Sequence, residues 1–192
     1  PVAVPSQDMV LGIYYLTQER PGAPGEGKFF KNVNEAILAY ENGVVTLHSR
    51  IRVRVSKKMA DGTTKTAIVE STVGRFIFNE IIPQDLGFVD RTVEENELKL
   101  EIDFHVGKKQ LKQILEKVIN THGATQTAIT LDDIKSIGYK YSTKAAMTVS
   151  ISDMTVPASK KQLIADAQAT VDRISKNFRR GLITEEERYK EV

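Results

Sequence analysis

The sequence contains no cysteine among its 192 residues. Disulfides, thiol nucleophiles and cysteine zinc sites are therefore excluded, and the composition fits a reducing cytosol. No apolar run approaches the length of a membrane span, and no basic segment followed by an apolar core opens the chain. We therefore expect neither membrane insertion nor a signal peptide. The net charge of +2 is too small to argue for nucleic-acid binding by itself.

Motifs for self-contained catalysis are also absent. The chain has no GxSxG, Walker A or HExxH pattern. Its three histidines, His48, His105 and His122, lack ligand spacing to one another. We expect the first two on solvated strand faces and the third at a helix end, where a cation is favourable. The residues alone therefore predict no catalytic group and no metal site.

What is present indicates a globular α+β protein. Hydrophobic residues make up 41% of the chain and charged residues 27%, as in folded domains. The length allows one domain or slightly more. Alternating segments and helical segments follow one another without an internal repeat. We predict small antiparallel sheets packed with helices, plus a protruding antiparallel helical hairpin.

Alternation of apolar and polar residues predicts several short strands. One hairpin turns at Asp61-Gly62, a dipeptide typical of such turns. Residues 9–16 are nearly all apolar, so they form either a buried strand or a short buried helix. The predicted strands are residues 46–56, 66–72, 97–105 and 147–154.

Helices are predicted where the apolar period lengthens to three or four residues. Capping residues and glycines mark their ends. We therefore interpret Asp132 and Asp133 as acidic residues in the first turn of a helix rather than as a catalytic pair. The predicted helices are 35–42 capped by Asn34 and ended by Gly43, 108–122 ended by Gly123, and 131–141 capped by Thr130.

The last segment predicts a helical hairpin. A helix starts at Ser159 and carries a narrow apolar seam as far as Phe178, and Gly181 breaks it. Thr184 and Glu187 then fit the capping-box pattern of a second helix. We expect this second arm to continue beyond Val192 in a longer protein, where it would cover the rest of the seam.

A basic strand face is the best candidate for contact with nucleic acid. Arg50, Arg52 and Arg54 lie on one side of the predicted strand 46–56. Three guanidinium groups on one face could bind phosphates. The competing interpretation is a solvated or salt-bridged strand face, and the sequence by itself favours it.

Five stretches, taken in order, resemble the β′ (largest) subunit of bacterial DNA-directed RNA polymerase. The similarity covers essentially the whole chain, and the ordered set is far more specific than any single string. The stretches are VPSQDMVLGIYYLT (4–17), LHSRIRVRV (47–55), STVGRFIFNEIIP (71–83), GYKYSTKAAMTVSISDM (138–154) and FRRGLITEEERY (178–189).

The resemblance implies a place between the aspartate loop that holds the catalytic magnesium and the trigger loop. Residues 1–155 would be the pore domain, and 156–192 the start of the funnel domain with its rim-helix hairpin. Such a region walls the secondary channel, through which nucleoside triphosphates enter and the RNA 3′ end is extruded. The fragment alone would be inactive, and Mg²⁺ would be held by residues outside it.

Site residues and partners also follow from the resemblance. Gln7 matches the glutamine nearest the active centre, and Glu187, Arg188 and Tyr189 match rim positions where cleavage and regulatory factors dock. The other partners would be the β, α, ω and sigma subunits, with DNA bound through the whole enzyme. The location would be cytoplasmic and nucleoid-associated. The alternative is a stand-alone interaction module that presents its helical hairpin.

Overall fold

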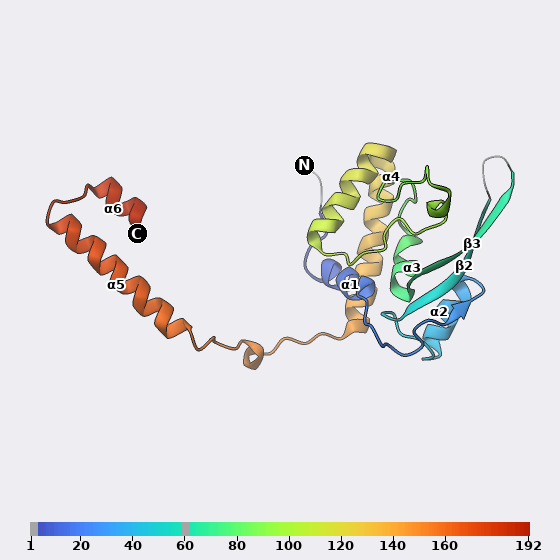
Figure 1. Cartoon of the computed structure of the whole chain (residues 1–192), viewed down its shortest axis with the longest axis horizontal. Coiled ribbons are helices and arrows are strands. Elements are labelled where there is room, and N and C mark those ends of the chain that lie inside the picture. Colours follow the sequence, from blue (N-terminus) through green and yellow to red (C-terminus); the bar gives the residue numbers. More distant parts are fainter. Residues whose placement is uncertain (1–3, 59–61) are drawn as a thin grey trace. The chain divides into compact units, whose positions relative to one another are not determined.

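The computed structural model describes residues 4–58 and 62–192. It divides into two compact units, one ending at Met147 and one spanning Thr148–Val192 (Figure 1). Six α-helices and one three-stranded sheet are described, with about 52% helix and 11% strand. The predicted α+β class is confirmed. The division into pore and funnel domains at residue 155 stays a prediction.

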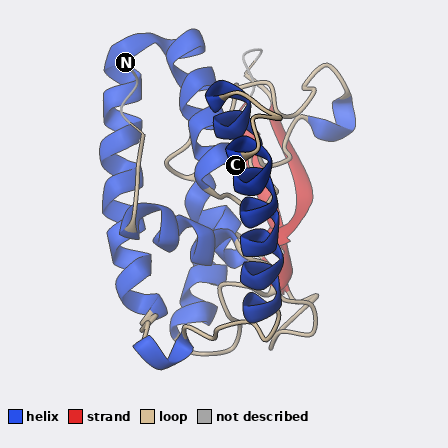
Figure 2. Cartoon of the chain, turned by 90° about the vertical axis from the view of Figure 1, so that its left-hand side faces the viewer, coloured by secondary structure: helices blue, strands red, loops and turns tan. Residues whose placement is uncertain are grey.

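The sheet of the first unit is a hairpin with one short strand added. β2 (Arg50–Lys58) pairs antiparallel with β3 (Thr64–Thr72), and β1 (Phe29–Phe30) pairs parallel with β2 on its other side. Figure 2 shows the strands of this sheet in red. The predicted turn at Asp61-Gly62 begins at a residue that lies outside the described part of the chain.

Strand β2 confirms the alternation but begins later than predicted. Ile51 and Val53 are buried, whereas Arg52 and Arg54 are exposed. Residues 46–49 form a turn instead, because the Ser49 hydroxyl accepts a hydrogen bond from the Thr46 backbone N–H at 2.9 Å. That turn puts consecutive side chains, including His48, into the interior.

Two other predicted strands are wrong. Residues 97–105 form an irregular loop that begins with turns, and side chains satisfy part of its backbone. Asn79 accepts from the Ile102 N–H at 3.0 Å, and Gln84 accepts from the Glu101 N–H at 3.0 Å. Residues 147–154 have no strand partner among the described residues, and a single 3₁₀ turn (Ile151–Asp153) forms there.

The apolar run near the start of the chain is a helix, α1 (Asp8–Thr17), which resolves the alternatives left open by the sequence. Helix α2 (Val33–Glu41) begins earlier than predicted, because Asn32 rather than Asn34 accepts the capping hydrogen bond from the Glu35 N–H at 2.8 Å. Helix α3 (Val73–Asn79) is buried along its whole length.

Helix α4 (Lys108–Ala145) consists of two helices joined at Gly123. Gly123 has φ 76° and ψ −175°, so the predicted helix end at this glycine is confirmed. The predicted cap at Thr130 is wrong, because the second helix begins directly after Gly123. Thr130 is buried in its interior, and its hydroxyl has no hydrogen-bond partner among the described residues.

The second unit contains the predicted hairpin. Helix α5 (Lys160–Arg179) ends before Gly181, which has φ 73°, and α6 (Glu185–Glu191) follows. The capping box is confirmed: the Thr184 N–H donates to Glu187 Oε2 at 2.7 Å, and the Glu187 N–H donates to Thr184 Oγ1 at 3.3 Å. Among the helices described, none has the length and hydropathy needed to cross a bilayer.

Backbone contacts between helices position the core of the first unit. A Cβ added at Gly12 of α1 would lie 1.8 Å from the Gly138 carbonyl oxygen of α4. A Cβ added at Gly74 of α3 would lie equally close, at 1.8 Å, to the Leu16 carbonyl oxygen. Because only glycine allows this approach, α1 lies directly on both helices. Around these contacts the apolar side chains form one cluster that includes Ile13, Leu16, Ile51, Phe78, Leu115 and Ile134.

The substitution Gly12→Ala is expected to lower the free energy of unfolding by about 3 kcal/mol or more, because the added methyl group overlaps backbone that cannot move aside. Urea unfolding followed by circular dichroism measures it. Gly107→Ala is the matched control, since its Cβ would meet only the Gln110 side chain, at 3.3 Å. Equal losses in the two variants would contradict the close-packing argument.

Candidate functional site

The three arginines of the basic face have different surroundings. Arg50 is held by three carboxylates: Nη1 lies 3.1 Å from Glu19 Oε2, Nε 2.9 Å from Glu70 Oε1, and Nη2 3.7 Å from Asp103 Oδ2. The salt-bridged interpretation therefore describes Arg50. Its contact with phosphates stays a prediction.

Arg52 and Arg54 are the accessible part of that face. Arg52 is exposed and donates from Nε and Nη2 to the Gly27 carbonyl at 3.2 and 3.1 Å. Arg54 is exposed, and no ion pair joins it to any residue in the described ranges. These two guanidinium groups can meet an anion from solvent, because no carboxylate within residues 4–58 and 62–192 forms an ion pair with either of them.

A buried ionic cluster centred on Arg75 is not predicted by the sequence. Arg75 is 6% exposed, and its Nε donates to the Thr17 carbonyl at 3.1 Å. Its Nη1 donates to Glu19 Oε2 at 3.1 Å and to Asp103 Oδ1 at 3.2 Å. The one available signal was a lone arginine inside the apolar run 73–82. Such a buried charge needs partners, and here they come from distant segments.

Two histidines cap the end of α1. His48 Nε2 lies 2.8 Å from the Tyr15 carbonyl oxygen, and His105 Nε2 lies 2.9 Å from that of Tyr14. The last carbonyls of a helix lack internal partners, so these rings satisfy them. The structural role is confirmed, but the predicted solvated position of His48 is wrong, because it is only 4% exposed.

Burial lowers the pKa of His48, and the nearby Arg20 and His105 lower it further, against the opposing effect of the Tyr15 hydrogen bond. The ring is therefore neutral in the folded protein near pH 7 and donates one hydrogen bond. The third histidine, His122, lies at the predicted helix end with Nε2 2.6 Å from Asp85 Oδ1.

Gln7 lies at the N-terminal end of α1 with an unusual backbone. Its φ is 51° and its ψ is −123°, a region that residues other than glycine rarely adopt. The side chain is exposed, and its amide makes no hydrogen bond with residues 4–58 or 62–192. The amide is therefore free to donate to and accept from a ligand.

The three predicted docking residues of the α5–α6 hairpin differ in their contacts and exposure. Hydrogen bonds from Thr184 hold the pKa of Glu187 below its usual value, which suits its place in the capping box. Arg188 pairs with Glu185 and lies 5.0 Å from the centre of the Phe178 ring. Tyr189 is 83% exposed. Tyr189 therefore offers a largely free side chain to a partner.

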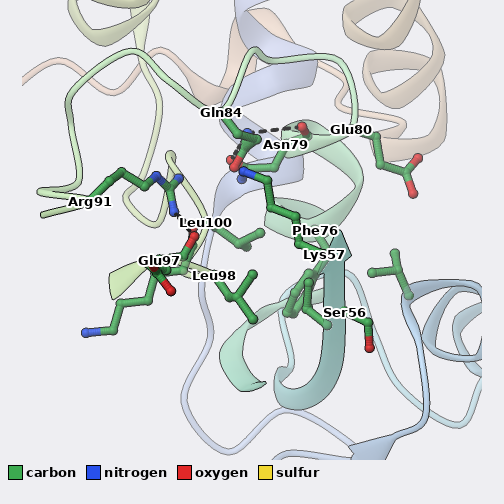
Figure 3. A pocket seen from close by; sticks show the side chains of 13 residues that line it. Ser56, Lys57, Phe76, Asn79, Glu80, Gln84, Arg91, Glu97, Leu98 and Leu100 are labelled. Atoms are coloured by element: carbon green, nitrogen blue, oxygen red, sulfur yellow. Dashed lines mark hydrogen bonds between the residues drawn. The ribbon is translucent and has the colours of Figure 1, made fainter. Parts of the chain in front are cut away.

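A mostly apolar cavity of about 270 Å³ lies in the first unit between β2, α3 and the loop 84–100 (Figure 3). Phe76, Leu98 and Leu100 line it, and the Gln84 amide donates to Asn79 Oδ1 at 3.0 Å beside it. In the described part of the chain, no group of three or more acidic or histidine side chains is arranged to hold a metal ion.

Comparison with known families identifies the class of protein. The family model described as RNA polymerase Rpb1, domain 3, matches residues 1–154. Since the match covers most of the chain, the chain belongs to this family.

Individual relatives narrow the identification. The chain is 72% identical over 192 residues to the DNA-directed RNA polymerase subunit beta′ of Lachnoclostridium phytofermentans. It is 55% identical to that of Acetivibrio thermocellus and 54% identical to that of Clostridium acetobutylicum. Each match covers 100% of this chain but only 15% or 16% of the relative. The resemblance to β′ subunits is confirmed.

Stability is expected to fall as the pH drops below about 6.5, the unperturbed pKa of histidine. Because the pKa of His48 is lower in the folded state, the unfolded chain binds more protons in this range, and acid favours unfolding. His48→Gln keeps a hydrogen-bond donor but cannot titrate. Urea unfolding between about pH 7.5 and about pH 5, both values chosen around that pKa, should show a shallower loss for this variant. Parallel curves would contradict the assignment.

Proposed function

We propose that the chain acts as part of a bacterial DNA-directed RNA polymerase, the nucleotidyltransferase of DNA-templated transcription, and forms the wall and rim of its secondary channel. The observation that supports this is the 72% identity to a β′ subunit across all 192 residues. A stand-alone interaction module is the weaker alternative, because the relatives from Lachnoclostridium, Acetivibrio and Clostridium are all β′ subunits of the polymerase.

The role of this segment is to provide shape rather than reacting groups. The Arg75 cluster and the helix contacts at Gly12 and Gly74 fix the segments of the first unit to one another. A wall held in this way keeps a path open beside a reactive centre without entering the chemistry. The catalytic Mg²⁺ would supply the phosphoryl-transfer chemistry. No acidic or histidine cluster among the described residues is arranged to hold it, and we propose that its ligands come from other parts of the subunit.

The path itself carries polyanions. Nucleoside triphosphates would pass inward, and the RNA 3′ end would pass outward when the enzyme backtracks. Gln7, with its free amide, would contact the RNA end or the nucleotide. Arg52 and Arg54 would raise the local nucleotide concentration by electrostatic attraction. This attraction does not require a defined binding geometry.

The remaining partners belong to the assembly. The β, α, ω and sigma subunits would surround this region, and DNA would be bound through the whole enzyme. The α5–α6 hairpin would present Tyr189, together with Glu187 and Arg188, to cleavage and regulatory factors at the channel mouth. Such an enzyme would work in the cytoplasm, at the nucleoid.

The double substitution Arg52→Ala with Arg54→Ala, made in assembled polymerase, is expected to raise the apparent KM for nucleoside triphosphates about two- to fivefold at low salt, as for other exposed charges. The effect should shrink at high salt, where such charges are screened. Arg→Lys at both positions is the matched control and should preserve the wild-type value. An unchanged KM in the alanine variant at low salt would reject the steering role.

A further inference from the structure

A cavity of about 540 Å³ lies beside the C-terminal end of α1. Twelve residues line it, and they come from α1, the loop 20–24, α2 and the segment 43–48. Two hydrogen bonds join the loop to the residues that precede β2. The Arg20 N–H donates to the His48 carbonyl at 3.1 Å, and Ser49 Oγ donates to the Pro24 carbonyl at 2.7 Å. The cavity therefore has fixed walls and the volume of a small-molecule site.

His48 contributes a hydrogen-bond acceptor that no described residue uses. It lines the cavity and is only 4% exposed. Because Nε2 donates to the Tyr15 carbonyl at 2.8 Å, the neutral ring carries its free lone pair on Nδ1. Nδ1 accepts from no residue in 4–58 or 62–192, and it is not among the buried atoms left without a partner, so solvent reaches it. A fixed acceptor of this kind favours a ligand with an O–H or N–H group.

Arg20 gives the cavity its charge. Among the twelve lining residues it is the only one with a permanent charge, and the His48 ring is neutral. The Arg20 side chain is exposed, and it forms no ion pair within the described ranges because the adjacent Glu19 is held by other arginines. Glu26 and Glu41, acids on the same segments, do not line the cavity. The lining is therefore complementary to an anion.

Two tyrosines give the cavity aromatic walls. Tyr15 and Tyr40 line it together with the buried side chains of Val45 and Leu47. The Tyr15 ring is held against His48, with 4.7 Å between the ring centroids. Burial raises the pKa of Tyr40, and Glu41 raises it further, so its hydroxyl stays protonated and can donate. Such walls suit a flat ring, because aromatic rings pack on one another by stacking or edge contacts.

One guanidinium group favours a carboxylate over a phosphate. The planar fork of Arg20 can donate two parallel hydrogen bonds to a carboxylate, whose single charge it balances. A phosphate monoester carries nearly two negative charges at neutral pH. No second cation is among the lining residues, although Lys144 Nζ lies 5.4 Å from the centre of the Tyr40 ring. The second charge of a phosphate would therefore be left unbalanced.

We propose that this cavity binds a small aromatic carboxylic acid that carries an O–H or N–H donor on its ring. The carboxylate pairs with Arg20, the donor meets His48 Nδ1, and the ring packs against Tyr15 and Tyr40. The inference goes beyond the proposed function, since it uses contacts of the first unit alone.

Photolabelling of assembled polymerase with an azide derivative of p-hydroxybenzoate tests the proposal. The labelled peptides are identified by mass spectrometry and should come from residues 15–24 and 40–48. Unlabelled p-hydroxybenzoate should compete best. Phenol lacks the carboxylate and should need about tenfold more for the same competition, and benzoate lacks the hydroxyl and should need roughly fivefold more.

Arg20→Gln should lower the labelling about tenfold, the effect of losing a hydrogen bond to a charged group. Lys28→Gln is the matched control, because Lys28 is also exposed and close in sequence but does not line the cavity. It should label as the wild type does.

Four outcomes would overturn the proposal: no label in these peptides, equal labelling of the two variants, phenol competing as well as p-hydroxybenzoate, or adenosine monophosphate competing better. The first includes a cavity already filled by a side chain of a neighbouring subunit. Co-purification with β and α is scored in the same preparation. Loss of that assembly in the wild-type chain would reject the proposed function instead, so the two failures are distinguishable.

Discussion

Arg75 is the group on which the arrangement of the first unit depends. Its guanidinium is nearly buried, and it joins the end of α1 at Thr17 to the carboxylates of Glu19 and Asp103. The same two carboxylates also hold Arg50 at the start of β2. A buried charge deprived of its partners is strongly destabilising, so the four groups hold one another in place. Helix α1, the β2–β3 hairpin and the loop before α4 therefore keep fixed relative positions.

The end of α1 shows how the surrounding segments complete this arrangement. His48 and His105 occupy the Tyr15 and Tyr14 carbonyls, while the Thr17 hydroxyl donates to the Ile13 carbonyl at 2.9 Å. The other side of the helix touches backbone at Gly138. A short helix, marginal alone, is thus stabilised by tertiary contacts on several sides. For the proposed channel wall, this gives Gln7 a rigid support.

Local signals predicted much of this fold, and long-range contacts explain what they missed. The breaks at Gly123 and Gly181, the Thr184 capping box and the alternation of β2 all depend on neighbours in sequence. The predicted strand 97–105 failed because the partners of its backbone, Asn79 and Gln84, lie far back along the chain. His48 was misplaced because a turn at Thr46 and Ser49 interrupts the alternation.

The sequence named the candidate residues, whose role stays a prediction, but it did not predict the contacts that surround them. The alternating pattern predicted Arg50, Arg52 and Arg54 on one face, yet only the structure shows that carboxylates neutralise Arg50 while Arg54 forms no ion pair with the described residues. The Arg75 cluster does not follow from any local pattern, since it joins residues from segments far apart in the sequence. Family resemblance supplied Gln7 and Tyr189, whose exposure the structure adds.

The central claim, that this chain lines the path of nucleotides and the RNA end, is tested most directly at Gln7. A photoreactive residue placed there in assembled polymerase, with the complex backtracked and the RNA 3′ end labelled, should crosslink to the terminal nucleotides. The same residue at Leu38, which is 57% exposed on α2, serves as the comparison. The account predicts labelling at Gln7 in excess of Leu38. Labelling at Leu38 alone, or at neither position, would contradict it.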